Sequence, residues 1–260
     1  MELRLDVALV NLGYFKTRNK SQEAIKSGIV KCNGKVQTKC NFSVDLNTKI
    51  EVGEVLKYVS RAGLKLEKAI EVFNLNLVNK IMLDIGSSTG GFTDCAIQKG
   101  IKKVIAVDVG TDVMDSELKK NPKIELYEQT DIREMDKKLL SDVQIATIDI
   151  SFISVTKILP VLEYLDNLKE IVLLIKPQFE CGKQIADKYK GLILNKTIHK
   201  DIINNIIKQF SNINFYCQGL APSPIKGGSG NIEYISYFKK DASLKLINIQ
   251  KVINEAFNIN

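Results

Sequence analysis

The chain has 260 residues, of which 45% are hydrophobic and 26% are charged, with a formal net charge of +7. This is the composition of an ordinary globular protein, and the length accommodates one medium domain and a small one. The basic balance favours a polyanionic partner, although charge alone does not establish one.

Cysteine and histidine usage argues against metal-binding and disulfide-rich classes. The five cysteines are scattered without a C-x-x-C pair, and His199 is the only histidine. We therefore expect free thiols and no metal site. Arg4 and Asp6 interrupt the N-terminal apolar run, which argues against a signal peptide. No segment approaches the roughly 20 apolar residues that span a bilayer, so we expect a cytoplasmic protein without a membrane partner.

Residues 1–58 are predicted to form a first, α+β unit. Helices are expected from residue 3 to near Gly13 and over 20–26, followed by strands at 29–32, 35–36, 50–52 and 55–59. Asn33-Gly34 between the first two strands is the strongest short-range hairpin signal. The unit contains ten basic and six acidic residues, which gives it a charge of about +4.

Basic residues concentrate around the second helix and the hairpin. They are Lys16, Arg18, Lys20, Lys26, Lys31 and Lys35. A solvated face and a phosphate-contacting surface are both consistent with the charge alone. The order of residues favours the second interpretation, since the segment resembles the S4-type RNA-binding module in its sequence RLDVALVNLGYFKTRNKSQEAIKSGIVKCNGK. The resemblance implies binding of structured RNA by shape and backbone, and we add Arg4 and Arg61 to the expected RNA contacts.

Residues 59–80 connect this unit to the rest of the chain. A helix is expected from Ser60-Arg61 through Phe73, with an apolar face that includes Leu66 and Ala69. Lys65 lies on this helix, and an exposed helix lysine is by itself an ordinary surface residue.

From Ile81 onward, predicted strands alternate with predicted helices. Strands are expected at 81–85, 103–108, 124–127, 144–149, 170–175, 213–219 and 231–238, and helices at 91–99, 112–120, 133–140, 154–165 and 197–210. This alternation predicts an α/β domain over 81–260 with a seven-stranded, mostly parallel sheet. No helix separates the last two strands, so an antiparallel pair is expected at the edge, as in Rossmann-like methyltransferases. Residues 241–260 fit a short amphipathic helix.

A glycine-rich turn follows the first of these strands, in the sequence DIGSSTGGFT from Asp84 to Thr93. A strand, a glycine turn and a helix N-terminus let a ligand approach the backbone closely. Because Asp84 would repel a pyrophosphate, a ligand with a cationic part, such as S-adenosylmethionine, fits better than a dinucleotide. The turn alone leaves a purely conformational role open.

Polar residues are expected at the carboxyl ends of the other strands, where ligands of such sheets bind. Asp108 is placed to accept hydrogen bonds from ribose hydroxyls, and Asp131 from an adenine amino group. Asp149 and Lys176 should face the same crevice, with Glu233 on the last strand. A structural Asp–Lys ion pair is the alternative.

Lysines beside acids suit methyl transfer to a ribose 2′-hydroxyl, which is a poor nucleophile at neutral pH. A lysine with a depressed pKa could take the hydroxyl proton or orient the oxygen lone pair. Lys65 could supply a second cation beside Lys176, and Asp149 and Glu233 could hold the lysines in place.

Seven motifs follow one another along the chain: SRAGLKL, LDIGSSTGGFTDC, AVDVG, TDIR, IDISFIS, LIKPQFE and KGGSGNIEY. In their order and spacing they resemble the TlyA family of RNA methyltransferases, which are often labelled hemolysins and have an FtsJ-like catalytic domain. The resemblance implies a catalytic set at Lys65, Asp149, Lys176 and Glu233. It implies S-adenosylmethionine binding at Asp84, Gly86, Ser88, Gly90, Gly91, Phe92, Asp108, Val109, Asp131, Ile132 and Asp149. It also implies 2′-O-methylation of cytidine in ribosomal RNA, with the large subunit favoured and the small subunit possible, and hence ribosomal RNA or ribosomal subunits as partners.

Two other functions compete with this one. An RNA-binding ribosome-assembly factor with an inactive methyltransferase domain is disfavoured by the intact catalytic positions. A membrane-active hemolysin is disfavoured by the absence of a signal, a spanning segment and a strongly cationic amphipathic helix.

Overall fold

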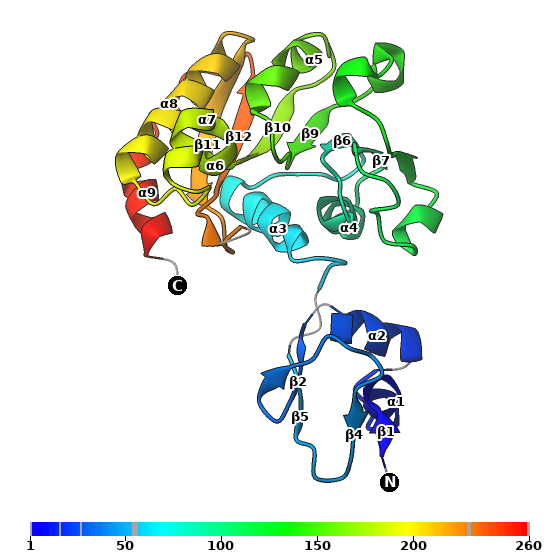
Figure 1. Ribbon diagram of the computed structural model, residues 1–260. Helices are drawn as coiled ribbons and strands as arrows, with labels where there is room; N and C mark the ends of the chain where they lie inside the picture. The colour runs from blue at the N-terminus through cyan, green and yellow to red at the C-terminus, as the bar shows by residue number, and fades with distance from the viewer. Residues whose placement is uncertain (1, 16, 27, 54–56, 228–229, 259–260) are drawn as a thin grey trace. The chain divides into compact units, whose positions relative to one another are not determined.

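The structure, a computed structural model, describes residues 2–15, 17–26, 28–53, 57–227 and 230–258, apart from the side chain of residue 23 (Figure 1). The chain divides into two compact units, Met1–Leu56 and Lys57–Asn260. We call these unit 1 and unit 2. Within the described ranges, no helix is both long enough and apolar enough to cross a membrane.

Unit 1 is a small α+β fold, as expected. Its elements are β1 (Leu3–Arg4), α1 (Leu5–Asn11), α2 (Arg18–Lys26), β2 (Val30–Cys32), β3 (Lys35–Val36), β4 (Ser43–Val44) and β5 (Ile50–Val52). Strand β2 pairs antiparallel with both β3 and β5. Asn33 and Gly34 both have positive φ angles, of 50° and 76°, which the tight β2–β3 turn requires and which confirms the predicted hairpin. Leu5, Leu9 and Ile25 are fully buried in the core of the unit.

Two expectations for unit 1 are wrong in detail. Leu3 and Arg4 were expected in the first helix but form β1, which pairs antiparallel with β4. That pairing joins Leu3 to Val44, so no local pattern could reveal it. Residues 55 and 56 of the expected strand 55–59 lie outside the described residues, and 57–59 form a bend rather than a strand.

Unit 2 is built on the predicted seven-stranded sheet. Its strands are β6 (Ile81–Ile85), β7 (Lys103–Val107), β8 (Ile124–Tyr127), β9 (Ile145–Ile148), β10 (Glu170–Ile175), β11 (Phe215–Pro222) and β12 (Tyr234–Lys240). Their spatial order is β11-β12-β10-β9-β6-β7-β8. Strand β12 runs antiparallel to both neighbours, whereas the pairs from β10 to β8 are parallel. The predicted fold class is therefore confirmed.

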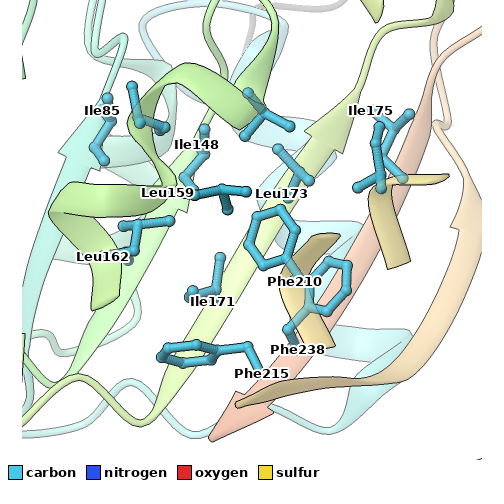
Figure 2. Close-up of a cluster of buried hydrophobic side chains, with 14 of the residues drawn as sticks. Ile85, Ile148, Leu159, Leu162, Ile171, Leu173, Ile175, Phe210, Phe215 and Phe238 are labelled. Atoms are coloured by element: carbon cyan, nitrogen blue, oxygen red, sulfur yellow. The ribbon is translucent and has the colours of Figure 1, made fainter. Parts of the chain in front are cut away.

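Helices cover both faces of this sheet. They are α3 (Ala62–Phe73), α4 (Gly91–Gln98), α5 (Leu159–Glu163), α6 (Pro177–Glu180), α7 (Lys183–Lys188), α8 (Lys196–Ser211) and α9 (Ile249–Phe257). One face buries side chains of α5, α8 and α9, and the other buries α3 and α4. Figure 2 shows the first face, where Ile171 and Leu173 of β10 lie between Leu162 of α5 and Phe210 of α8. The two-sided burial explains why the central strands are almost continuously apolar.

Two expected helices are replaced by short 3₁₀ turns. In place of a helix over 112–120 there is a single turn at Leu118–Lys120. Asp112 has a φ angle of 51°, which is not helical, and the turn ends where Asn121 is extended before Pro122. In place of a helix over 133–140 there are turns at Ile132–Glu134 and Lys137–Leu140. Each is capped by the side chain of an aspartate, Asp131 and Asp136, so the second cap interrupts any continuous helix.

Three further boundaries differ from expectation. The segment 154–165 contains a 3₁₀ turn at Val155–Ile158 followed by the short helix α5, which has a proline in its first turn. Helices α6 and α7 were not predicted, and they follow β10 directly. Strand β12 begins at Tyr234, so Glu233 lies immediately before the last strand rather than on it.

Candidate functional site

Three cavities lie in unit 2 around the carboxyl ends of the parallel strands. Cavity A has a volume of about 720 Å³ and includes Lys65, Lys176 and Glu233 in its lining. Cavity B, of about 340 Å³, is lined by the glycine turn, Arg61 and Asp149. Cavity C, of about 470 Å³, is lined by Asp108, Asp131 and the segment after β9. The edge of the sheet therefore offers connected space for more than one ligand group.

The glycine turn has a backbone that other residues could not adopt without strain. Gly86 and Gly90 have φ angles of +80° and +90°. A Cβ atom on Gly86 would lie 2.8 Å from the backbone oxygen of Asp149, and one on Gly91 would lie 2.4 Å from the Ser60 Oγ. Glycine is thus needed both for conformation and for close approach of β6, β9 and α3.

Asp84 lies behind this turn rather than at its surface. The residue has 0% exposed area, and its carboxylate accepts hydrogen bonds from the Thr93 Oγ1 at 2.6 Å and the Thr147 Oγ1 at 2.8 Å. Burial raises the pKa of Asp84 to about 6, because desolvation outweighs the two hydrogen bonds. Asp84 lines none of the three cavities, so the structure gives it a role in joining β6, α4 and β9 and does not bring it to the ligand space.

The next two strand-end acids lie at cavity C. The Asp108 carboxylate accepts from the backbone N–H groups of Ser88 at 2.8 Å and Gly110 at 2.7 Å. Asp131 pairs with Arg133, whose guanidinium lowers the pKa of the aspartate. Other expected cofactor residues at the cavities are Gly86, Ser88, Val109, Ile132 and Asp149 at cavity C, and Gly91 and Phe92 at cavity B. Gly90 lines none of the three.

The four expected catalytic residues form two ion pairs. The Lys65 Nζ lies 2.7 Å from the Glu233 Oε2, and the Lys176 Nζ lies 2.6 Å from the Asp149 Oδ1. Lys65, Lys176 and Glu233 are each less than 10% exposed. Both lysines line cavities A and B. Buried charges need partners of this kind, because an unpaired buried charge is strongly destabilising.

The sequence positions of these residues explain how they meet. Lys65 lies on the buried face of α3, which ends at the left-handed Asn74. Asp149 and Lys176 directly follow the adjacent parallel strands β9 and β10, so both lie at the same edge. Glu233 precedes β12, which runs antiparallel to β10 and therefore begins where β10 ends.

Several residues that line the site were not predicted. They are Ser151, Phe152, Gln178, Phe179 and Asn231. The Gln178 Nε2 donates to the Glu233 Oε1 at 3.4 Å, and the rings of Phe152 and Phe179 lie 5.0 Å apart. Phe152 is 87% exposed and has a φ angle of 68°, which is strained for a bulky residue. The available signal for Ser151 and Phe152 was a hydroxyl and an aromatic residue two and three positions after the strand-end acid Asp149.

The expected RNA-contacting residues belong mostly to unit 1. Arg4 and Arg18 are half-exposed, and both donate to the fully buried carboxylate of Asp6, at 3.0 Å and 2.9 Å. These arginines, with Gln22, hold the pKa of Asp6 well below its usual range. The expected lysines at 20, 26, 31 and 35 are exposed, Lys16 lies outside the described residues, and Arg61 belongs to unit 2.

Comparisons with known proteins cover both units. Residues 58–240 match the family model of FtsJ-like methyltransferases, and residues 3–50 match the S4 domain. A Brachyspira hyodysenteriae protein named Hemolysin A is 41% identical over 91% of this chain and 99% of its own length. The Campylobacter jejuni protein named 23S rRNA (cytidine-2′-O)-methyltransferase TlyA is 37% identical over 86% of this chain and 95% of its own. A solved structure of a Streptococcus thermophilus protein, 36% identical, covers 98% of this chain and 95% of its own, with a TM-score of 0.74.

Proposed function

The chain belongs to the FtsJ-like methyltransferase family, in the group of S4-containing TlyA relatives, and we propose that it methylates the 2′-hydroxyl of a cytidine in ribosomal RNA. The large ribosomal subunit is the proposed target, with S-adenosylmethionine as the methyl donor. The observation that carries this proposal is the meeting of two buried Lys–acid pairs beside a glycine turn, at the mouth of a cavity large enough for a nucleotide.

The residues at cavities B and C fit S-adenosylmethionine. Gly86 lines cavities B and C, and Asp108 lines cavity C, where its carboxylate would accept hydrogen bonds from ribose hydroxyls. Ser87 lines cavity B, and its Oγ is buried without a hydrogen-bond partner among the described residues. The nearby Asp149 carboxylate suits a cationic ligand. When bound, the cofactor supplies a methyl group on a positively charged sulfur, which leaves as a neutral thioether.

The chain's own residues would then hold the attacking oxygen in line with that methyl group. The 2′-oxygen would take up the methyl group supplied by the cofactor, and the hydroxyl proton would pass to solvent water. Lys176 and Lys65 lie at the junction of cavities A and B, where they can orient the hydroxyl and stabilise negative charge that develops on its oxygen. Fixed orientation of this kind supplies much of the rate acceleration in bimolecular reactions.

Unit 1 supports the choice of RNA as substrate. The buried Asp6 carboxylate holds the half-exposed side chains of Arg4 and Arg18 at the surface of unit 1. Four described lysines are exposed around α2 and the β2–β3 hairpin. Arginine and lysine contacts to phosphates position a nucleic acid and make binding dependent on salt.

The test is transfer of tritiated methyl groups to purified large and small ribosomal subunits, followed by mapping of ribose methylation in both RNAs. We expect one methylated cytidine in the large-subunit RNA. Lys176→Met should abolish incorporation, whereas Lys157→Met, which removes an exposed lysine of the same domain, should not. Absence of incorporation into either subunit by the wild-type protein would refute the proposal and favour an assembly factor without activity.

A further inference from the structure

Ser151 lies where the three cavities meet. It follows β9 by three residues, and its side chain is exposed. It is the one described residue that lines cavity A, cavity B and cavity C together. A group at this position is within reach of both the cofactor and the target nucleotide.

The hydroxyl of Ser151 also completes the contacts of Lys176. The Lys176 Nζ lies 2.6 Å from the Asp149 Oδ1, 2.9 Å from the Ser151 Oγ and 3.3 Å from the Asp149 backbone oxygen. A lysine ammonium has three N–H donors and no acceptor. Two of these contacts are hydrogen bonds, from the Nζ to the Ser151 Oγ and to the Asp149 backbone oxygen, and the third is an ion pair with the Asp149 Oδ1. The bond to the Ser151 Oγ is the shorter of the two, and a substrate oxygen that binds the ammonium at this position has to replace it.

Of the three partners, Ser151 is the one that a substrate hydroxyl can replace at least cost. The Asp149 carboxylate is held by charge, and its backbone oxygen is fixed by the chain. The Ser151 Oγ is a neutral alcohol oxygen on a rotatable bond, and a ribose 2′-oxygen is also a neutral alcohol oxygen. The exchange substitutes one hydrogen bond for another of the same kind.

We infer that Ser151 is a positioning residue for methyl transfer, a role that rests on the function proposed above. In the free protein, its hydroxyl holds the Lys176 ammonium at the junction of the cavities. When the target nucleotide enters, its 2′-oxygen takes that place beside Lys176. The Ser151 O–H then becomes available to donate a hydrogen bond to the same oxygen, since no described residue accepts from it.

The test compares Ser151→Ala, Ser151→Thr and the control Ser141→Ala, which removes an exposed hydroxyl that lines none of the three cavities. We would measure kcat and KM for ribosomal subunits at saturating S-adenosylmethionine, and cofactor affinity by calorimetry. Ser151→Ala should lower kcat by about 10- to 100-fold. This is the effect of losing one hydrogen bond to the 2′-oxygen while negative charge develops on that oxygen. KM and cofactor affinity should stay close to wild type. Ser151→Thr keeps the hydroxyl and should retain most of the activity.

Two results would overturn the inference alone. One is an active wild-type protein with unchanged kcat in Ser151→Ala. The other is a loss in Ser151→Ala that appears entirely as weaker cofactor binding or a higher KM, or that Ser151→Thr shares in full. A wild-type protein that transfers no methyl group would instead refute the proposed function itself, and this inference with it.

Discussion

The buried carboxyl group of Asp84 should contribute less to the stability of unit 2 as pH rises from acid to neutral. Its side chain is fully buried, and its pKa is raised from 3.8 to about 6 because burial disfavours the charged form. A carboxyl group whose pKa is higher in the folded protein contributes stability below its unfolded pKa of 3.8. That contribution is lost as pH rises through about 6.

The size of this effect follows from the shift. A difference of one pKa unit corresponds to about 1.4 kcal/mol, so a rise from 3.8 to about 6 corresponds to about 3 kcal/mol. Asp84→Asn removes the charge and keeps the shape. Its amide oxygen can accept from one threonine, and its NH₂ group can donate to the other after that hydroxyl rotates. We therefore expect the variant to gain up to about 3 kcal/mol of unfolding free energy over wild type between pH 4 and pH 8.

Urea unfolding followed by tyrosine fluorescence measures this difference. Seven of the eight tyrosines lie in unit 2 and the chain has no tryptophan, so the signal reports mainly on that unit. Asp142→Asn, which removes the same charge from an exposed position, is the control. A difference between Asp84→Asn and wild type that stays constant from pH 4 to pH 8 would show that the carboxylate is not desolvated as the structure indicates.

Three other substitutions test other parts of the structure. Gly86→Ala should destabilise unit 2 by about 1–3 kcal/mol, because the φ angle of Gly86 is positive and the new Cβ would meet a backbone oxygen. An unchanged Tm would refute the positive φ angle and the close contact at Gly86. Burial lowers the pKa of His199, so the unfolding free energy of wild type should decrease relative to that of His199→Gln as pH falls below about 6.5. A difference between the two proteins that stays constant over this pH range would contradict it. Asp6→Asn should weaken RNA binding and reduce its salt dependence, because Arg4 and Arg18 lose the carboxylate that fixes their side chains. Asp45→Asn, at an exposed position in the same unit, is the control, and equal binding by both variants would argue against the anchor.

The sheet of unit 2 could be predicted because its signals are local. Each central strand is a short apolar run, and the glycine turn marks where β6 ends and α4 begins. The 3₁₀ turns could not be predicted in the same way. Their charged residues are compatible with helix, and the deciding feature is where the aspartate side chains at 131 and 136 cap the backbone.

The residues of the candidate site also differ in whether local sequence signals could predict them. Asp149 and Lys176 could be placed together because they end parallel strands. Glu233 was expected on the last strand and Lys65 on the linking helix, and the family resemblance then joined all four in one catalytic set. The sequence did not reveal that Asp84 is enclosed by two threonines, since an acid at a strand end can point either into the core or toward the ligand. Nor did it reveal Ser151, because its contact with Lys176 depends on the course of the chain after β9.

The Lys65–Glu233 pair also has a consequence for the order in which the protein is made. The two residues are 168 positions apart, so at 5–20 residues per second a ribosome needs roughly 8–34 seconds to add the second after the first. Until then α3 carries a lysine whose acidic partner does not exist, and burying that lysine alone would be costly. The nascent chain therefore cannot form the Lys65–Glu233 pair before residue 233 has been added. An enzyme whose proposed substrate is ribosomal RNA would thus have a complete site only after a ribosome has added Glu233.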